Sequence, residues 1–308
     1  MKKIAYIFLF LLHFSAYSQK NEDVIASGNS KLHYKTFGSG KPILIINGGP
    51  GMNCEGFGYL AEEISKFGFQ TIIYDQRGTG KSVVEKINDE TISMDLMVDD
   101  MENLRKHLKI EKWTILGHSF GGMLAAYYAT KHPQNIDKMI FSSSGGVNMN
   151  FTSYGQQRLN ANLTKTQKDS MNYYQSKMDK GDNSLETKKQ RAKYLANAYV
   201  YDKKNAPIIA ERLIHVNFDV NGIVFQSLIK NNFDCSEKFG NFHNSVLILQ
   251  GENDIISIDT AKEIEKAFPN SQLIALPNCG HYGWLDAKEM YFNALKQFLK
   301  TKTNTTKN

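Results

Sequence analysis

The residue best placed to do chemistry in this sequence is Ser119. It lies in the run Gly-His-Ser-Phe-Gly-Gly, residues 117–122, which follows the apolar segment 113–116 and precedes the small-residue stretch 123–129. A strand, a Gly-x-Ser-x-Gly turn and a helix in this order are typical of a nucleophile elbow, which holds a serine hydroxyl exposed at the edge of a sheet. The flanking glycines are needed because side chains there would strike the neighbouring strand and helix. The alternative is an ordinary strand–helix turn with a capping serine.

Such a nucleophile requires an acid and a histidine later in the chain, in that order. The apolar run 246–250 leads into Gly-Glu-Asn-Asp, which ends at Asp254, and the run 272–276 leads into Pro-Asn-Cys-Gly-His, which ends at His281. Both residues thus follow strands and are expected at the sheet edge that carries the serine. We predict that His281 accepts the proton of Ser119 and that Asp254 orients the imidazole and stabilises its charged form.

Other residues compete for these two roles. Glu252 and Asp259 lie close to Asp254 in the chain, and either could serve as the acid. A structural role is the alternative for His281. The remaining candidates for the base after or beside the elbow are His107, His118, His132, His215 and His243.

A glycine-rich loop in the N-terminal half of the chain could provide backbone N–H groups as hydrogen-bond donors. The β-rich run 43–46 ends in Asn-Gly-Gly-Pro-Gly, residues 47–51. Such a loop can stabilise the negative oxygen of a tetrahedral intermediate. We predict that Gly49 and Phe120, the residue after the nucleophile, donate their N–H groups to this oxyanion. The alternative is a tight turn without a ligand, and the Gly-x-x-x-x-Gly-Lys pattern of a phosphate loop is absent.

Three segments together resemble the proline iminopeptidase (prolyl aminopeptidase) group of α/β-hydrolases, serine peptidases of clan SC. Residues 47–52 are similar to the group's His-Gly-Gly-Pro-Gly loop, residues 75–82 to its Asp-Gln-Arg-Gly-x-Gly-x-Ser sequence, and residues 117–122 to its elbow. The resemblance implies an α/β-hydrolase fold with an inserted helical lid. It also implies an acyl-enzyme mechanism, no cofactor and no metal, and release of N-terminal proline or another residue from short peptides.

The chain departs from this group where the substrate would bind. Asn47 stands where the group has a histidine, and Ile255 follows the predicted acid where the group has a carboxylate that holds the substrate's α-amine. We therefore expect Glu211 or Asp219 to supply the missing carboxylate and Trp284 to contact substrate. The alternatives are an esterase or lactonase, or a non-catalytic ligand-binding protein. A buried acid facing the nucleophile would favour the aminopeptidase.

The rest of the chain contains elements that can position these residues. We expect strands at 31–37, 43–47, 70–74, 113–116, 138–142, 246–250 and 272–276, and helices at 57–67, 93–108, 121–131, 260–268 and 287–299. This alternation predicts a mostly parallel α/β sheet with helices on both faces. Residues 19–145 and 241–300 would form the core. Residues 146–240, with helices at 185–201 and 206–218, would form the lid, whose inner face could include Tyr154, Tyr173, Tyr174, Tyr199, Tyr201 and Phe225.

The first residues are typical of an export signal. A basic start, Met-Lys-Lys, precedes the apolar run 4–14 and the small residues 15–18. This pattern predicts a signal peptide over 1–18, cut near Gln19, and a periplasmic or extracellular protein with no stable membrane insertion after cleavage. The alternative is an uncleaved anchor, for which the apolar run is short.

Composition limits the possible partners. The 308 residues carry a formal net charge of +6, spread along the chain, so we expect a small peptide or acyl substrate and no nucleic-acid partner. The three cysteines, Cys54, Cys235 and Cys279, lack metal-ligand spacing, and one disulfide of unassigned pairing is compatible with export. Asp75 and Arg77 are expected to pair locally. Residues 301–308 form a polar tail, and no oligomeric state is predicted.

Overall fold

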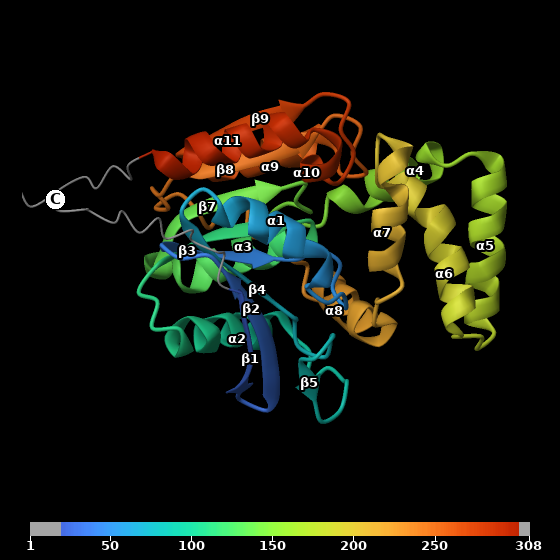
Figure 1. Cartoon of the computed structure of the whole chain (residues 1–308), viewed down its shortest axis with the longest axis horizontal. Coiled ribbons are helices and arrows are strands. Elements are labelled where there is room, and N and C mark those ends of the chain that lie inside the picture. The colour runs from blue at the N-terminus through green and yellow to red at the C-terminus, as the bar shows by residue number, and fades with distance from the viewer. Residues whose placement is uncertain (1–19, 302–308) are drawn as a thin grey trace, which may run out of the picture.

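A twisted sheet runs through the computed structural model, which describes residues 20–301 (Figure 1). Eight of its nine strands lie in the order β1-β2-β4-β3-β6-β7-β8-β9, and β5 pairs with β2. The strands are β1 (Lys20–Ser27), β2 (Ser30–Phe37), β3 (Lys41–Ile46), β4 (Phe69–Tyr74), β5 (Val83–Val84), β6 (Trp113–His118), β7 (Ile136–Ser142), β8 (Val246–Gly251) and β9 (Ser271–Leu276). All pairings from β4 to β9 are parallel, whereas those of β2 are antiparallel. The predicted mostly parallel sheet is confirmed.

Helices cover both faces of this sheet because its strands are apolar on both sides. Side chains alternate between the faces along a strand. Leu44 and Ile46 of β3 therefore belong to the apolar cluster that includes residues of α2, α3 and α9, whereas Ile43 and Ile45 belong to the cluster that includes residues of α1 and α11. Figure 1 shows α1 and α11 on one side and α2 on the other. The helices of the core are α1 (Gly58–Ser65), α2 (Met94–His107), α3 (Phe120–Lys131), α9 (Ile258–Ala267), α10 (Gly283–Asp286) and α11 (Lys288–Lys300).

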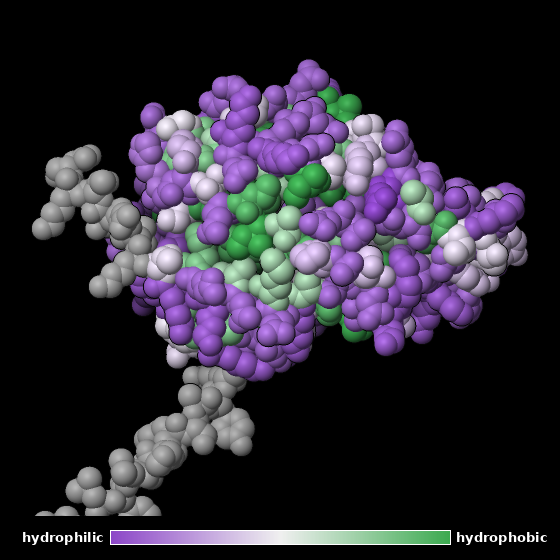
Figure 2. All heavy atoms as spheres, turned by 90° about the horizontal axis from the view of Figure 1, so that it is seen from above, coloured by the Kyte–Doolittle hydropathy of each residue, from purple (hydrophilic) through white to green (hydrophobic). Residues whose placement is uncertain are grey.

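The segment between β7 and β8 forms a separate group of helices beside the ends of the parallel strands (Figure 1). These lid helices are α4 (Phe151–Asn162), α5 (Lys165–Asp179), α6 (Leu185–Leu195), α7 (Ala206–Leu213) and α8 (Phe218–Lys230). Three of them, α4, α5 and α8, were not expected from the sequence; α5 begins with a capping box in which Thr164 and Gln167 exchange hydrogen bonds. Figure 2 shows that the lid presents mainly hydrophilic side chains to solvent.

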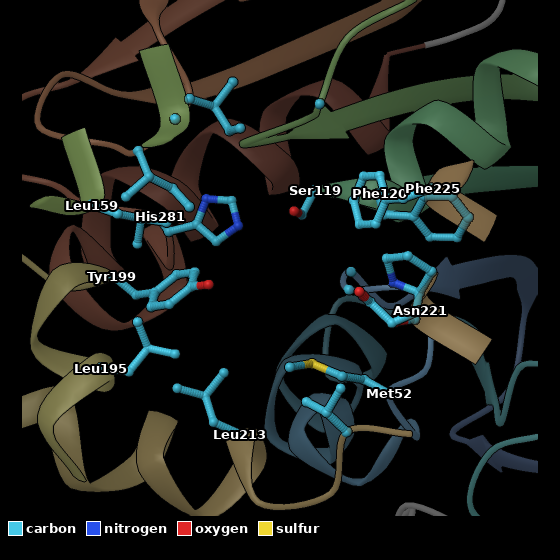
Figure 3. A pocket seen from close by; sticks show the side chains of 18 of the residues that line it. Met52, Ser119, Phe120, Leu159, Leu195, Tyr199, Leu213, Asn221, Phe225 and His281 are labelled. Carbon is cyan, nitrogen blue, oxygen red and sulfur yellow. The ribbon is translucent and has the colours of Figure 1, made fainter. Parts of the chain in front are cut away.

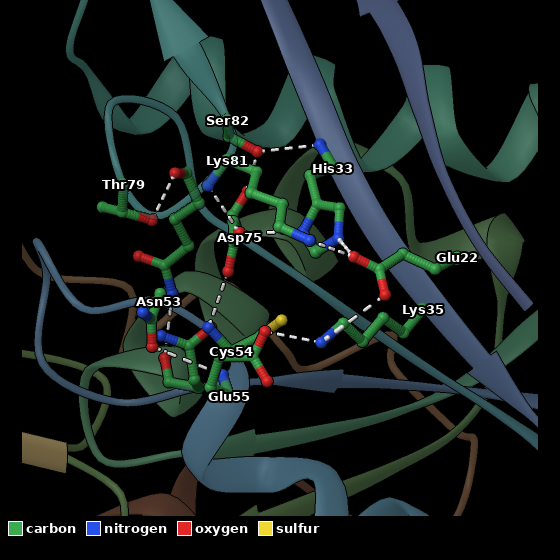
Figure 4. A network of polar contacts seen from close by, with 12 residues as sticks. Glu22, His33, Lys35, Asn53, Cys54, Glu55, Asp75, Thr79, Lys81 and Ser82 are labelled. Carbon is green, nitrogen blue, oxygen red and sulfur yellow. Dashed lines mark hydrogen bonds and ion pairs between the residues drawn. The ribbon is translucent and has the colours of Figure 1, made fainter. Parts of the chain in front are cut away.

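Asp75 connects three segments of the core near the loop that precedes α1 (Figure 4). Its carboxylate contacts Nδ1 of His33 at 2.8 Å and accepts the backbone N–H groups of Cys54 at 2.8 Å and Lys81 at 2.9 Å. The expected pairing with Arg77 does not form, because the guanidinium of Arg77 makes two 2.8 Å hydrogen bonds to Asp100 of α2 instead. Asp75 therefore has an architectural role: it fixes the start of the short helical turn that follows the glycine-rich loop.

Several sequence-based predictions concern the chain ends and the cysteines. The predicted signal peptide, residues 1–18, lies outside the described residues, as does the polar tail beyond residue 301. Within residues 20–301, no helix has the length and apolar character to span a bilayer. Cys54, Cys235 and Cys279 are all buried free thiols, so the disulfide considered from the sequence does not form in this structure.

Candidate active site

Ser119 lies at a strained turn between β6 and α3. Its φ of 55° and ψ of −122° lie in a region that residues other than glycine seldom adopt. The glycines around it are required for close approach: a Cβ at Gly117 would lie 2.4 Å from the carbonyl oxygen of Gly121, and a Cβ at Gly121 would lie 2.2 Å from that of Ile46. The structure thus has the backbone geometry expected of a nucleophile elbow, with the hydroxyl directed out of the turn.

His281 and Asp254 are in contact beside this turn. Nδ1 of His281 lies 2.7 Å from Oδ1 of Asp254, and the two residues are only 3% and 1% exposed. The carboxylate also accepts hydrogen bonds from the N–H of Ile256 at 3.1 Å and the amide of Gln250 at 2.8 Å. An ionised carboxylate accepts hydrogen bonds and donates none. The hydrogen between the two groups therefore belongs to Nδ1 of His281, and Nε2 keeps a free lone pair.

The two alternative acids do not reach this histidine. Glu252 and Asp259 are exposed, and Asp259 forms a 2.9 Å ion pair with Lys262 on the surface of α9. Asp254 is therefore the acid that the geometry supports.

Ser119 and His281 face each other in one pocket. Figure 3 shows the serine hydroxyl directed toward the imidazole ring. No hydrogen bond joins the two side chains in the described part of the chain, and such bonds often tighten only when a substrate is bound. Free Nε2 on one side and a hydroxyl on the other form the arrangement in which a serine proton can be transferred to a histidine.

His118, next to Ser119 in sequence, lies behind His281 and outside the pocket. The two rings are 4.6 Å apart between centroids. Burial holds the pKa of His118 well below its usual range, so this ring is neutral. Its Nδ1 lies 3.0 Å from the carbonyl oxygen of Ser142 and donates to it. His118 is thus a structural residue that supports the wall behind the predicted base.

The predicted oxyanion loop approaches Ser119 closely. A Cβ at Gly48 would lie only 2.5 Å from Cβ of Ser119, and Gly49 has a φ of 68°. Phe120 begins α3, so its N–H has no intrahelical acceptor. Among residues 20–301, neither the N–H of Gly49 nor that of Phe120 has a hydrogen-bond partner. Asn47, where the resembling group has a histidine, donates from Nδ2 to the carbonyl of Met52 at 2.9 Å and so closes the loop.

A mostly apolar cavity of about 500 Å³ lies between the sheet edge that carries Ser119 and the lid (Figure 3). The lid contributes apolar side chains from every helix except α5. Apolar side chains that line the cavity include Met52, Phe120, Met123, Phe151, Leu159, Leu195, Leu213, Val216, Phe225, Ile255 and Ile256. Tyr199 directs its hydroxyl into the cavity, and burial raises the pKa of this hydroxyl to about 12, which keeps it protonated as a donor. Of the six lid aromatic residues considered from the sequence, only Tyr199 and Phe225 line this cavity.

The three residues expected to bind substrate lie outside the cavity, so those predictions are wrong. Glu211 and Asp219 are exposed, because each lies on the solvent side of its lid helix, and neither lines the cavity. Trp284 is 2% exposed and packs against the rings of Phe57 and His118, so it belongs to the core. No acidic residue of the described chain lines the cavity.

Sequence reasoning missed several polar residues around the site. Gln250 holds both Asp254 and the carbonyl of Ile256, and the only signal for it was a polar residue at the end of an apolar strand. Arg191 and Arg212 line the cavity from the lid, and Asn221 does so beside the glycine-rich loop. These last three carried no sequence signal because they lie in a long polar segment.

One cluster of the described residues has the composition of a metal site. The ligand atoms of His33, Cys54 and Asp75 lie within 4.8 Å of one another, away from the cavity. Both ring nitrogens of His33 are already in contact with carboxylates, with Nε2 at 2.7 Å from Glu22. Burial also raises the pKa of the Cys54 thiol, which disfavours the thiolate that a metal requires. The cluster is therefore a hydrogen-bonded structural network (Figure 4).

Comparison with known proteins gives consistent matches. The alpha/beta hydrolase fold family matches residues 41–288. A Mycoplasma genitalium protein provisionally named proline iminopeptidase is 30% identical to the chain, covering 89% of it and 94% of the relative. The proline iminopeptidase of Saccharolobus solfataricus is 27% identical, covering 86% of the chain and 87% of the relative. Among solved structures, an esterase from Exiguobacterium antarcticum has a TM-score of 0.67 at 19% identity. The match covers 90% of this chain and 99% of the esterase chain.

Proposed function

The chain belongs to the alpha/beta hydrolase family and is similar to proline iminopeptidases, and from this premise we propose that it is a serine hydrolase that works through an acyl-enzyme. The observation that carries the proposal is the convergence of Ser119, His281 and Asp254 at the edge of one apolar cavity. This arrangement also argues against a protein that only binds a ligand, because such a protein has no need of a strained serine beside an oriented imidazole.

The proposed reaction begins with attack of Oγ of Ser119 on the carbonyl carbon of the substrate. As the new C–O bond forms, the serine proton moves to Nε2 of His281, and the electron pair of the carbonyl becomes an oxyanion near the N–H groups of Gly49 and Phe120. The intermediate then collapses and expels the amine or alcohol, which takes the proton from His281. Water repeats the sequence on the acyl-enzyme, so that the acid is released and Ser119 is regenerated.

The acidic partner has a defined part in these steps. While His281 holds the extra proton, its ring is positive, and the ionised carboxylate of Asp254 beside Nδ1 stabilises that charge. The hydrogen bonds from Gln250 and Ile256 hold the carboxylate in place. In the proposed cycle Asp254 therefore stabilises charge without accepting a proton, and protons move only between substrate, water, Ser119 and His281.

The cavity favours an acyl group without a positive charge. Burial of an ammonium group without a counter-charge is destabilising. The described residues that line the cavity include no carboxylate, and they include two positively charged side chains, Arg191 and Arg212. We therefore propose small esters or amides with an uncharged, apolar acyl group as substrates. The names of the relatives support a second candidate, release of N-terminal proline from short peptides.

A comparison of matched substrates tests this choice. We expect the 4-nitroanilide of N-acetylproline to be hydrolysed with a kcat/KM at least equal to that of the free-amine proline 4-nitroanilide, and 4-nitrophenyl butyrate to be hydrolysed faster than either. The physical reason is the unpaired α-ammonium group of the free-amine substrate. A clear preference for the free amine over the acetylated substrate would contradict the uncharged-acyl proposal and support the aminopeptidase.

We also propose that the enzyme is exported. The support is the basic, apolar and small-residue pattern of residues 1–18, followed at once by β1, which starts at Lys20. Mature protein from the native host is expected to begin near Gln19 and to be recovered outside the cytoplasm, as measured by N-terminal sequencing of fractionated cells. A protein that begins at Met1 and sediments with membranes would contradict cleavage and indicate an uncleaved anchor.

A further inference from the structure

The glycine-rich loop beside Ser119 is held largely by the lid. Residues 48–51 have four carbonyl oxygens. Apart from a long contact of 3.5 Å between Nδ2 of Asn47 and the carbonyl of Gly48, only the carbonyl of Gly49 is bonded within the loop, by the N–H of Met52 at 3.0 Å. The lid donates to the other three, from Nη2 of Arg212 to Gly48 at 2.7 Å, from Nδ2 of Asn221 to Pro50 at 2.8 Å, and from the N–H of Asn217 to Gly51 at 2.7 Å. A loop of the core thus takes its shape from side chains and backbone of the inserted segment.

Arg212 is an unusual donor for this task. It is only 7% exposed, yet its guanidinium forms no ion pair with any acidic residue of the described chain. Its Nη1 donates to the hydroxyl of Tyr282 at 2.7 Å, its Cζ lies 4.9 Å from the ring centre of Phe57, and its Nε has no acceptor. Burial of a cation without a counter-ion is destabilising, so a structural role alone would be served better by a neutral side chain.

The position of Arg212 suggests what the charge does. The carbonyl of Gly48 and the N–H of Gly49 belong to the same planar peptide group. A charged donor on the oxygen of that group polarises it and strengthens its N–H as a donor, because hydrogen bonds in series reinforce one another in a low-dielectric site. The N–H of Gly49 is the predicted oxyanion donor, and it has no other partner in residues 20–301.

We propose that the lid completes the oxyanion hole: Arg212 is a positioning residue that orients and polarises the Gly48–Gly49 peptide group, and Asn217 and Asn221 fix the remainder of the loop. The inference rests on the proposed acyl-enzyme mechanism and holds for esters and amides alike. The lid then contributes to the rate of the chemical step in addition to the shape of the cavity.

This role predicts a specific kinetic pattern. Interactions made only in the transition state affect kcat, whereas contacts that merely shape the cavity affect KM. Loss of one direct oxyanion donor lowers kcat by about 10²–10³-fold. Because Arg212 acts through a peptide group, we expect Arg212→Met to lower kcat for 4-nitrophenyl butyrate by on the order of 10–100-fold with little change in KM.

The experiment compares four variants. Arg212→Lys keeps the charge and one donor and should recover part of the kcat that Arg212→Met loses. Asn221→Ala removes one loop contact from a half-buried position and should lower kcat by on the order of a few-fold. The matched control is Asn162→Ala, which removes a lid asparagine that donates to the carbonyl of Ala198 within the lid, at 2.9 Å, and should leave kcat unchanged.

Binding of butylboronic acid provides a second measurement, because its tetrahedral adduct with serine carries a negative charge like the intermediate. We expect its inhibition constant to rise in Arg212→Met and Asn221→Ala by the factors lost in kcat. Unchanged kcat and boronate affinity in folded Arg212→Met and Asn221→Ala proteins would overturn the inference, as would a loss confined to KM. If Ser119→Ala retained activity, the proposed mechanism itself would fail, and this outcome is distinguishable from the others.

Discussion

Replacement of Ser119 by alanine is expected to abolish turnover, with kcat falling by on the order of 10⁴-fold or more. The variant should also lose labelling by a fluorophosphonate probe, since no other described side chain combines the turn, the exposed hydroxyl and a neighbouring imidazole. The fold should survive, because alanine is smaller than serine and the hydroxyl makes no hydrogen bond within the described chain. Active-site labelling and steady-state kinetics measure the effect, and circular dichroism reports on the fold.

A matched control for this variant lies on the lid. Ser176 of α5 is exposed and far from the cavity lining, so Ser176→Ala should keep both labelling and turnover. Labelling that persists in Ser119→Ala while it disappears from another serine variant would show that the elbow does not carry the nucleophile.

Asp254→Asn is expected to lower kcat by on the order of 10⁴-fold, while substrate affinity changes much less. The amide that replaces the carboxylate has nearly the same size, but its NH₂ group cannot accept a hydrogen bond from Nδ1 of His281. The ring then tends to carry its hydrogen on Nε2, where it cannot take the proton of Ser119. The carboxylate is also lost as the partner of the charged imidazolium. Steady-state kinetics at saturating substrate measure this change.

The two neighbouring acids provide the comparison. Glu252→Gln and Asp259→Asn remove exposed carboxylates and should each leave kcat within a few-fold of the parent enzyme, as is usual for surface substitutions. A loss below tenfold in Asp254→Asn, together with a large loss in either neighbour, would assign the acid to that neighbour and would require a different arrangement around His281.

The core could be predicted from the sequence because its signals are local. Buried strands such as β6 and β8 are short apolar runs, and a parallel sheet needs such runs on both faces. The order of Ser119, Asp254 and His281 in the chain, each after such a run, was enough to place them at one edge. Two strands were not predicted because they lack such an apolar run: β1 is largely polar and exposed, and β5 has only two residues.

The lid could not be predicted to the same depth. Its helices are polar and lie far from their partners in sequence, so nothing local shows which side of a helix faces the cavity. Glu211 was a plausible substrate ligand by residue type, yet it lies on the exposed side of α7, whereas Arg212, the next residue, is turned inward. A rotation of about 100° per residue along a helix separates the two. The prediction that Trp284 contacts substrate was wrong because the sequence does not show that α10 packs this side chain into the core.

The three buried thiols have a consequence for where this chain can acquire its structure. With no disulfide among Cys54, Cys235 and Cys279, folding requires no oxidant. Burial also raises the pKa of each thiol, which suppresses the reactive thiolate. The folded chain is thus indifferent to the redox state of its surroundings, whether a reducing cytoplasm or an oxidising exterior. Recombinant protein lacking residues 1–18 can accordingly be produced in an ordinary reducing host and stored with reductant without altering any covalent link.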